Sequence, residues 1–96
     1  MSTETFLVKT KPKTAAMKAQ TAMKQARLKG FSLKAWGVTQ SGDAFIANAR
    51  WEEQGLFGDV AELRVEAQPS YNGTEVVIDF SNRRCENLAE RLRRSL

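Results

Sequence analysis

The chain contains no histidine, and this absence restricts its chemistry more than any other feature of the composition. Nucleophile pairs of the Ser-His or Cys-His type are excluded, and so is every metal site that needs an imidazole ligand. The carboxylates show no calcium-loop spacing, and no glycine-rich loop precedes a helix to hold a phosphate. We therefore expect a protein that is not an enzyme and that binds neither a cofactor nor a metal ion.

Cysteine and long apolar runs are also scarce. Cys85 is the single cysteine, which excludes an internal disulfide and is typical of a reducing compartment. Apolar runs are only a few residues long, whereas a transmembrane helix needs about 20. Residues 1–5 also lack the basic start and apolar stretch of a signal peptide. These absences predict a cytoplasmic protein without membrane contact.

What remains is an ordinary globular composition in a short chain. Hydrophobic residues make up 42% of the 96 residues and charged residues 27%, and both classes are interspersed along the chain. A chain of this length has enough apolar surface for one core and too little to divide between two. We expect residues 1–96 to form a single domain.

Two helices are predicted from strong helix formers and capping signals. The first covers 14–29, with Thr14 as its N-cap and a glycine after its last turn. The second covers 82–95, with Ser81 or Asn82 as its cap and apolar residues at helical spacing.

Strands are predicted from alternating apolar residues and from turn residues. Strict alternation from 61 to 68 indicates a half-buried strand, and Asn72-Gly73 is typical of a type I′ hairpin turn. The predicted strands cover 5–11, 31–40, 44–52, 61–68 and 76–80.

The order β-α-β-β-β-β-α predicts an α+β fold. Its antiparallel sheet of about five strands is covered on one face by the two helices. The successive hairpins in the middle of the chain form a meander, and the first strand joins the sheet through the first helix.

Cys85 lies on the same face of the second predicted helix as Leu88 and Leu92. A place in the first turn of a helix lowers the pKa of a thiol, whereas burial raises it. We expect burial to dominate, because a domain this small needs the apolar face of the helix to cover its sheet. Cys85 is therefore predicted to be a structural thiol.

Charge is segregated along the chain. Residues 1–34 carry eight basic and one acidic side chain, residues 35–80 carry two and eight, and residues 81–96 carry five and two. The predicted helices are therefore basic and the strands between them acidic. The basic layer either contacts the phosphates of a nucleic acid or complements the acidic sheet of the same or a neighbouring molecule. The candidate phosphate contacts are Lys18, Lys24, Arg27, Lys29, Arg84, Arg91 and Arg94.

The uncovered face of the sheet is the rival candidate site. An apolar patch in a polar field is typical of a surface that binds a partner. A bulge at Gly37 would instead turn Trp36 toward the core. The apolar residues predicted on this outer face are Trp36, Val38, Ile46 and Val77.

These patterns favour a small non-enzymatic accessory protein, an adaptor or inhibitor, that binds another protein or a second copy of itself. The predicted contacts are the outer sheet face and the loop 55–58, where Leu56 and Phe57 either dock the partner or cap the core. A nucleic-acid-binding module that uses the basic helices 14–29 and 82–95 is the alternative. An apolar ligand pocket under the sheet is disfavoured, because the alanine-rich face of the first helix leaves little room.

Overall fold

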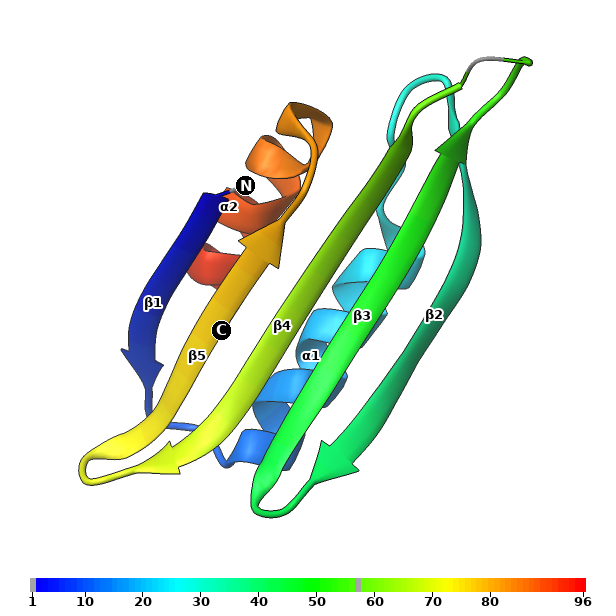
Figure 1. Cartoon of the computed structure of the whole chain (residues 1–96). Coiled ribbons are helices and arrows are strands. Elements are labelled where there is room, and N and C mark those ends of the chain that lie inside the picture. Colours follow the sequence, from blue (N-terminus) through cyan, green and yellow to red (C-terminus); the bar gives the residue numbers. More distant parts are fainter. Residues whose placement is uncertain (1, 57) are drawn as a thin grey trace.

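The computed structural model describes residues 2–56 and 58–96, which form one antiparallel sheet and two helices. The predicted α+β class and the order β-α-β-β-β-β-α are confirmed (Figure 1). The elements are β1 (Ser2–Val8), α1 (Pro12–Gln25), β2 (Phe31–Ser41), β3 (Ala44–Glu53), β4 (Val60–Ser70), β5 (Gly73–Phe80), the 3-10 turn η1 (Arg83–Cys85) and α2 (Glu86–Ser95).

The strand order in the sheet is β1-β5-β4-β3-β2, so β1 and β2 are its two edges. The chain leaves β1, crosses the sheet through α1 to the far edge, and returns by hairpins until β5 pairs with β1. Both helices lie on one side of the sheet, and no helix of the described residues covers the other side (Figure 1). We call these sides the helix face and the outer face.

Helix α1 starts and ends earlier than the predicted range 14–29. Pro12 occupies the first turn, where its fixed φ suits a helix and its missing N–H leaves no donor unpaired. Lys11 is the N-cap and makes no side-chain cap, so the prediction of Thr14 as the cap is wrong. At the other end, Ala26 turns to an extended conformation (φ −74°, ψ 145°) and ends the helix. Propensity alone did not reveal this end, because residues 26–29 are mostly good helix formers.

The C-terminal helix is preceded by a tighter turn. Asn82 accepts a hydrogen bond from the Arg84 backbone N–H at 2.9 Å and so caps this turn. The N-cap of α2 itself is Cys85, which makes no side-chain cap, so the prediction that Ser81 or Asn82 caps the helix is wrong. The turn η1 follows, and α2 begins at Glu86 rather than at 82. Cys85, Leu88 and Leu92 are buried on one side of this segment, as the helical spacing predicted.

Alanines allow α1 to lie close to the sheet. Its buried face is formed by Ala15, Ala16 and Ala19, and the strand it contacts most, β3, offers alanines at the same face. Small residues on both surfaces bring the backbones together, and larger side chains fill the space around them. The largest fully buried side chains are Trp51, Met23, Leu63, Ile78 and Leu92.

The β4–β5 hairpin forms where Asn72-Gly73 predicted it, but its turn differs. Ser70 pairs with Gly73 across the hairpin, which leaves Tyr71 and Asn72 in the loop. Asn72 has no positive φ, so the predicted type I′ turn is wrong; Gly73, at φ +140°, takes the unusual conformation alone. A Cβ at Gly73 would collide with the carbonyl oxygen of Val8, so only glycine lets β1 approach here.

Candidate functional site

A β-bulge in the edge strand β2 determines which side chains face the helices. The register between β2 and β3 shifts between Leu33 and Ala35, so Lys34 is the extra residue. After the bulge, Trp36 pairs with Ala49, and the residues that follow Trp36 alternate between the two faces without a further shift. Because Ala49 is buried on the helix face, Trp36 lies on that face too.

The prediction of Trp36 and Val38 on the outer face is therefore wrong. Val38 pairs with Ala47, another buried residue of the helix face, and is itself half-buried against the core. The bulge that turns these residues lies at Lys34, three residues before the predicted alternative at Gly37. One inserted residue moves every following side chain of the strand to the opposite face of the sheet.

Trp36 is nevertheless on the surface, because β2 is an edge strand. Its side chain is 48% exposed and lies at the margin between β2 and α1. The Lys24 Nζ atom stands 5.7 Å from the centroid of its ring, within the range of a cation–π contact. A large aromatic side chain is thus held at the open edge of the sheet by the neighbouring helix.

The edge segment Ala35–Ser41 carries no charged residue and no proline. Native edge strands are commonly protected by charges, prolines or bulges, since their free N–H and C=O groups can pair with another strand. The bulge at Lys34 interrupts only the start of β2. The seven residues after it form an extended strand that is unprotected by side-chain chemistry.

The opposite edge is protected. Glu4 of β1 pairs with Ile78, a buried residue of the helix face, so this carboxylate points inward on an edge strand. Its Oε2 atom is buried and has no hydrogen-bond partner among residues 2–56 and 58–96. Glu4 is half-buried, so a strand added beside β1 would cover more of this polar side chain without giving the buried oxygen a partner, which is unfavourable.

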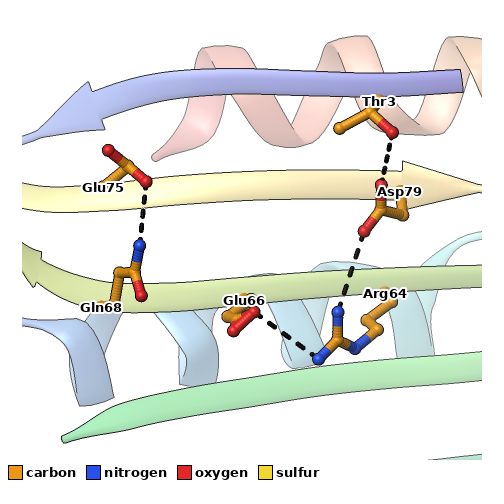
Figure 2. A network of polar contacts seen from close by, with 6 residues as sticks. All are labelled: Thr3, Arg64, Glu66, Gln68, Glu75 and Asp79. Carbon is orange, nitrogen blue, oxygen red and sulfur yellow. Dashed lines mark hydrogen bonds and ion pairs between the residues drawn. The ribbon is translucent and has the colours of Figure 1, made fainter.

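The outer face carries a network of polar contacts (Figure 2). Arg64 contacts Asp79 at 3.8 Å and Glu66 at 3.6 Å, and Thr3 donates a hydrogen bond to Asp79 at 2.6 Å. Farther along the sheet, Gln68 donates to Glu75 at 2.9 Å. Each of these contacts joins neighbouring strands or residues of one strand, so the face is a ladder of paired polar groups.

Ile46 and Val77 do lie on this outer face, but not together. One cross-strand row runs Thr5, Val77, Glu66, Ile46, Thr39, so a glutamate separates the two apolar residues. Both are half-buried. The predicted patch of four residues is therefore divided between the two faces of the sheet.

The loop between β3 and β4 forms a separate projection. Its base is closed by a hydrogen bond from the Glu53 N–H to the Asp59 carbonyl oxygen at 2.8 Å. Leu56 is 96% exposed, so it does not cap the core, while Phe57 lies outside the described residues. Trp36 pairs with the middle of β3, and Leu56 follows the end of that strand, so they do not form one contact surface.

The predicted phosphate contacts are distributed over three segments. Lys18 and Lys24 are exposed on α1, and Arg91 and Arg94 are exposed on α2. Arg84 belongs to η1, and Arg27 and Lys29 lie in the connection after α1 rather than in a helix. Arg94 donates to Glu90 at 2.9 Å, an exposed i, i+4 pair. A hollow of about 560 Å³ beside α1 is lined by Lys13, Thr14, Met17, Lys18, Thr21, Ala22, Gln25 and Ser95.

Cys85 is fully buried, as predicted, and its Sγ atom lies 4.0 Å from the Glu62 carbonyl oxygen. Burial raises the pKa of this thiol from 9.0 to about 11. The neutral thiol is the form that the fold favours. Its contribution to the free energy of unfolding is complete below pH 9 and is lost as the pH rises toward 11.

We expect the folded protein to react slowly with an alkylating reagent at neutral pH, because the Cys85 thiolate is rare and covered. Adding denaturant should make the reaction fast. Mass spectrometry of the alkylated fraction against time, in native buffer and in denaturant, measures both rates. Equal rates in the two conditions would contradict a structural thiol and return thiol chemistry to consideration.

In the part of the chain that the structure describes, no three His, Cys, Asp or Glu side chains gather as a metal site. None of the described helices combines the length and the apolar character that crossing a bilayer requires. No protein-family model, curated protein or solved structure matches this chain.

Proposed function

We propose that this protein is a non-enzymatic binding module that takes up a strand of another polypeptide at the edge of β2. The contact segment is Ala35–Ser41, and Trp36 and Val38 are its main side-chain contacts. The observation that carries the proposal is the segment Ala35–Ser41 of the edge strand β2, which has no charged residue and no proline and which holds a half-exposed tryptophan. Strand addition uses main-chain hydrogen bonds for affinity and alternate side chains for specificity.

The arrangement of β2 suits this mode of binding. Its pairing with β3 occupies one side of the backbone, and no strand in the described part of the chain pairs with the other side. Trp36 offers a large apolar surface at low cost in conformational entropy, which is why tryptophan is frequent at the centre of interfaces. A strand laid beside Ala35–Ser41 would cover this ring.

Two exposed threonines provide a matched test. Thr39 on β2 and Thr5 on β1 lie at opposite ends of the same cross-strand row. Thr39→Lys places a charge on the proposed binding edge, and Thr5→Lys places the same charge on the other edge. A lysine on an edge strand blocks strand addition.

Tagged parent, Thr39→Lys and Thr5→Lys proteins are to be used as baits in an extract of the source cells after nuclease treatment. We expect the parent and Thr5→Lys to retain the same polypeptide and Thr39→Lys to lose it. Retention of that polypeptide by all three proteins would refute binding at β2. Circular dichroism of the three baits controls for folding.

The basic helix layer supports a second candidate function, nucleic-acid binding. The observation in its favour is that positive side chains gather on α1 and α2, while the charged side chains of the outer sheet face are mainly acidic. Such a separation would direct phosphates to the helix face.

If nucleic acid is the partner, the affinity for a generic duplex should fall steeply as the salt concentration rises, because each phosphate contact releases counterions. Reversing the charge of Arg84 and Arg91 should reduce the slope of log K against log salt by about one unit for each phosphate contact removed. Arg50→Glu on the outer face is the control and should leave the slope unchanged. Weak binding that does not respond to salt would exclude this function.

A further inference from the structure

We propose that the strand accepted at this edge is β2 of a second copy, so that two chains form one continuous antiparallel sheet. This inference rests on the proposed function and adds the identity of the partner. The two Ala35–Ser41 segments would pair about a two-fold axis at Val38, which brings all seven residues of each segment into the ladder.

The unequal edges of the sheet favour a closed dimer. If β2 of one copy paired with β1 of another, each added copy would leave a new free edge and the assembly would grow into a filament. The inward carboxylate of Glu4 opposes that pairing, because its buried oxygen already lacks a partner. Of the two edges of the described sheet, β2 is the one without an inward carboxyl group, and pairing β2 with β2 uses this edge of both copies.

The side chains of Ala35–Ser41 are complementary to themselves. About an axis at Val38, Gly37 lies opposite Thr39 of the second copy and Ala35 lies opposite Ser41. These small residues belong to the outer face, where they meet without a clash. On the helix face, Trp36 lies opposite Gln40 and diagonally beside Val38 of the second copy, within reach of an aromatic side chain.

The space on the helix face also fits this arrangement. Helix α1 packs mainly on β3, so the two copies of α1 would stand three strand spacings apart, about 14 Å. Helices in direct contact are separated by about 8–10 Å, so side chains must fill the gap between these two. Trp36 and Val38 of each copy lie in that gap.

Charge does not oppose the pairing. The paired segment is neutral, so no like charges face each other across the new ladder. Lys24 stays beside Trp36, and the two Trp36 residues lie four positions apart along the strand, about 14 Å. This separation exceeds the Debye length of about 8 Å at physiological salt, so the two Lys24 ammonium groups are largely screened from each other.

The backbone of β2 provides a second disruptive variant. Gly42 and Asp43 form a two-residue loop, so Ser41 and Ala44 are the first hydrogen-bonded pair and the next residue, Gln40, directs its N–H away from β3. Gln40→Pro removes that outward donor without removing a bond of the ladder inside the chain. Within the chain, this substitution removes only the side-chain hydrogen bond that Gln40 donates to the Gly42 carbonyl oxygen.

Sedimentation equilibrium over a wide range of protein concentration tests the proposal. We expect the mass of the parent and of Thr5→Lys to rise from one chain to two and to stop there. Thr39→Lys and Gln40→Pro should keep the mass of one chain while retaining the circular dichroism of the parent. In Thr39→Lys the two introduced lysines would also lie diagonally across the axis and repel each other.

Several outcomes overturn the proposal. One is a parent that keeps the mass of a single chain at every concentration, and another is growth of the parent beyond two chains. Loss of the dimer in Thr5→Lys to the same extent as in Thr39→Lys is a third. If the parent is a monomer but its baits still retain a polypeptide in a Thr39-dependent way, the self-pairing is wrong and the proposed function stands; if neither occurs, both are wrong.

Discussion

Replacing Trp51 with alanine is expected to lower the free energy of unfolding by about 3–5 kcal/mol. Trp51 is 1% exposed, lies on the helix face of β3 and is the largest fully buried side chain. Its indole N–H has no hydrogen-bond partner, so the loss comes from packing and from the cavity left behind rather than from a polar contact. Urea titration followed by circular dichroism measures the change.

Trp36→Ala is the matched comparison on the neighbouring strand. Because Trp36 is 48% exposed, it buries about half as much surface, and we expect a loss of about 1–2 kcal/mol. The same variant should weaken partner binding at β2, whereas a Trp51 variant acts only through stability. Equal losses of stability for the two tryptophans would show that Trp36 belongs to the core and not to a binding edge.

Gly73→Ala is expected to cost about 1–3 kcal/mol of stability. Gly73 has φ +140°, a conformation that L residues rarely adopt, and an added Cβ would meet the carbonyl oxygen of Val8. Relief of that collision would push β1 away from β5 at the end of the sheet. Thermal or urea unfolding of the variant measures the loss.

Gly37→Ala controls for the general effect of replacing glycine. Gly37 lies in β2 without a positive φ, and a Cβ there would meet no atom within 4 Å. We expect a change within about 0.5 kcal/mol. If Gly73→Ala were as mild as Gly37→Ala, the close approach of β1 to the β4–β5 hairpin would not be a constraint on the fold.

The order of elements and the core faces of β3, β4 and β5 could be read from the sequence. Each of these strands alternates without interruption, so an apolar residue at one position assigns every second residue to the same face. Burial of Cys85 followed in the same way from its helical spacing with Leu88 and Leu92.

The faces of β2 could not be read by the same rule. Its apolar residues keep a spacing of two from Phe31 to Leu33 and again from Trp36 to Val38, but the step between the pairs is three. That step of three residues is the local sign of the bulge at Lys34. The alternation of side chains between the two faces is interrupted there, so it cannot be continued from Leu33 to Trp36. The whole candidate site therefore lies at the edge of the sheet rather than on its outer face.

The proposed binding edge has a signal in the sequence. No charged residue occurs between Lys34 and Asp43, although charged residues make up 27% of the chain. Glu4 precedes the predicted strand 5–11, but it has the same phase as Phe6, so in the strand β1 of the structure its carboxyl group lies on the inward side. The sequence alone does not show which strands are at the edges of the sheet, because the topology decides this. These two observations therefore become informative only once the structure shows that β1 and β2 are the two edges.

Residue-resolved amide hydrogen exchange of β2 tests the central claim, that Ala35–Ser41 accepts a strand. Hydrogen-bonded and free positions alternate along an edge, so the N–H groups of Trp36, Val38 and Gln40 point away from β3 and those of Gly37 and Thr39 point toward it.

In dilute protein we expect the outward amides to exchange fast and the inward ones slowly. At high protein concentration, or with the retained polypeptide added, exchange at the three outward positions should slow strongly, and in Thr39→Lys it should stay fast. Outward amides of the parent that exchange equally fast in the dilute, concentrated and partner-bound states would contradict strand addition at β2.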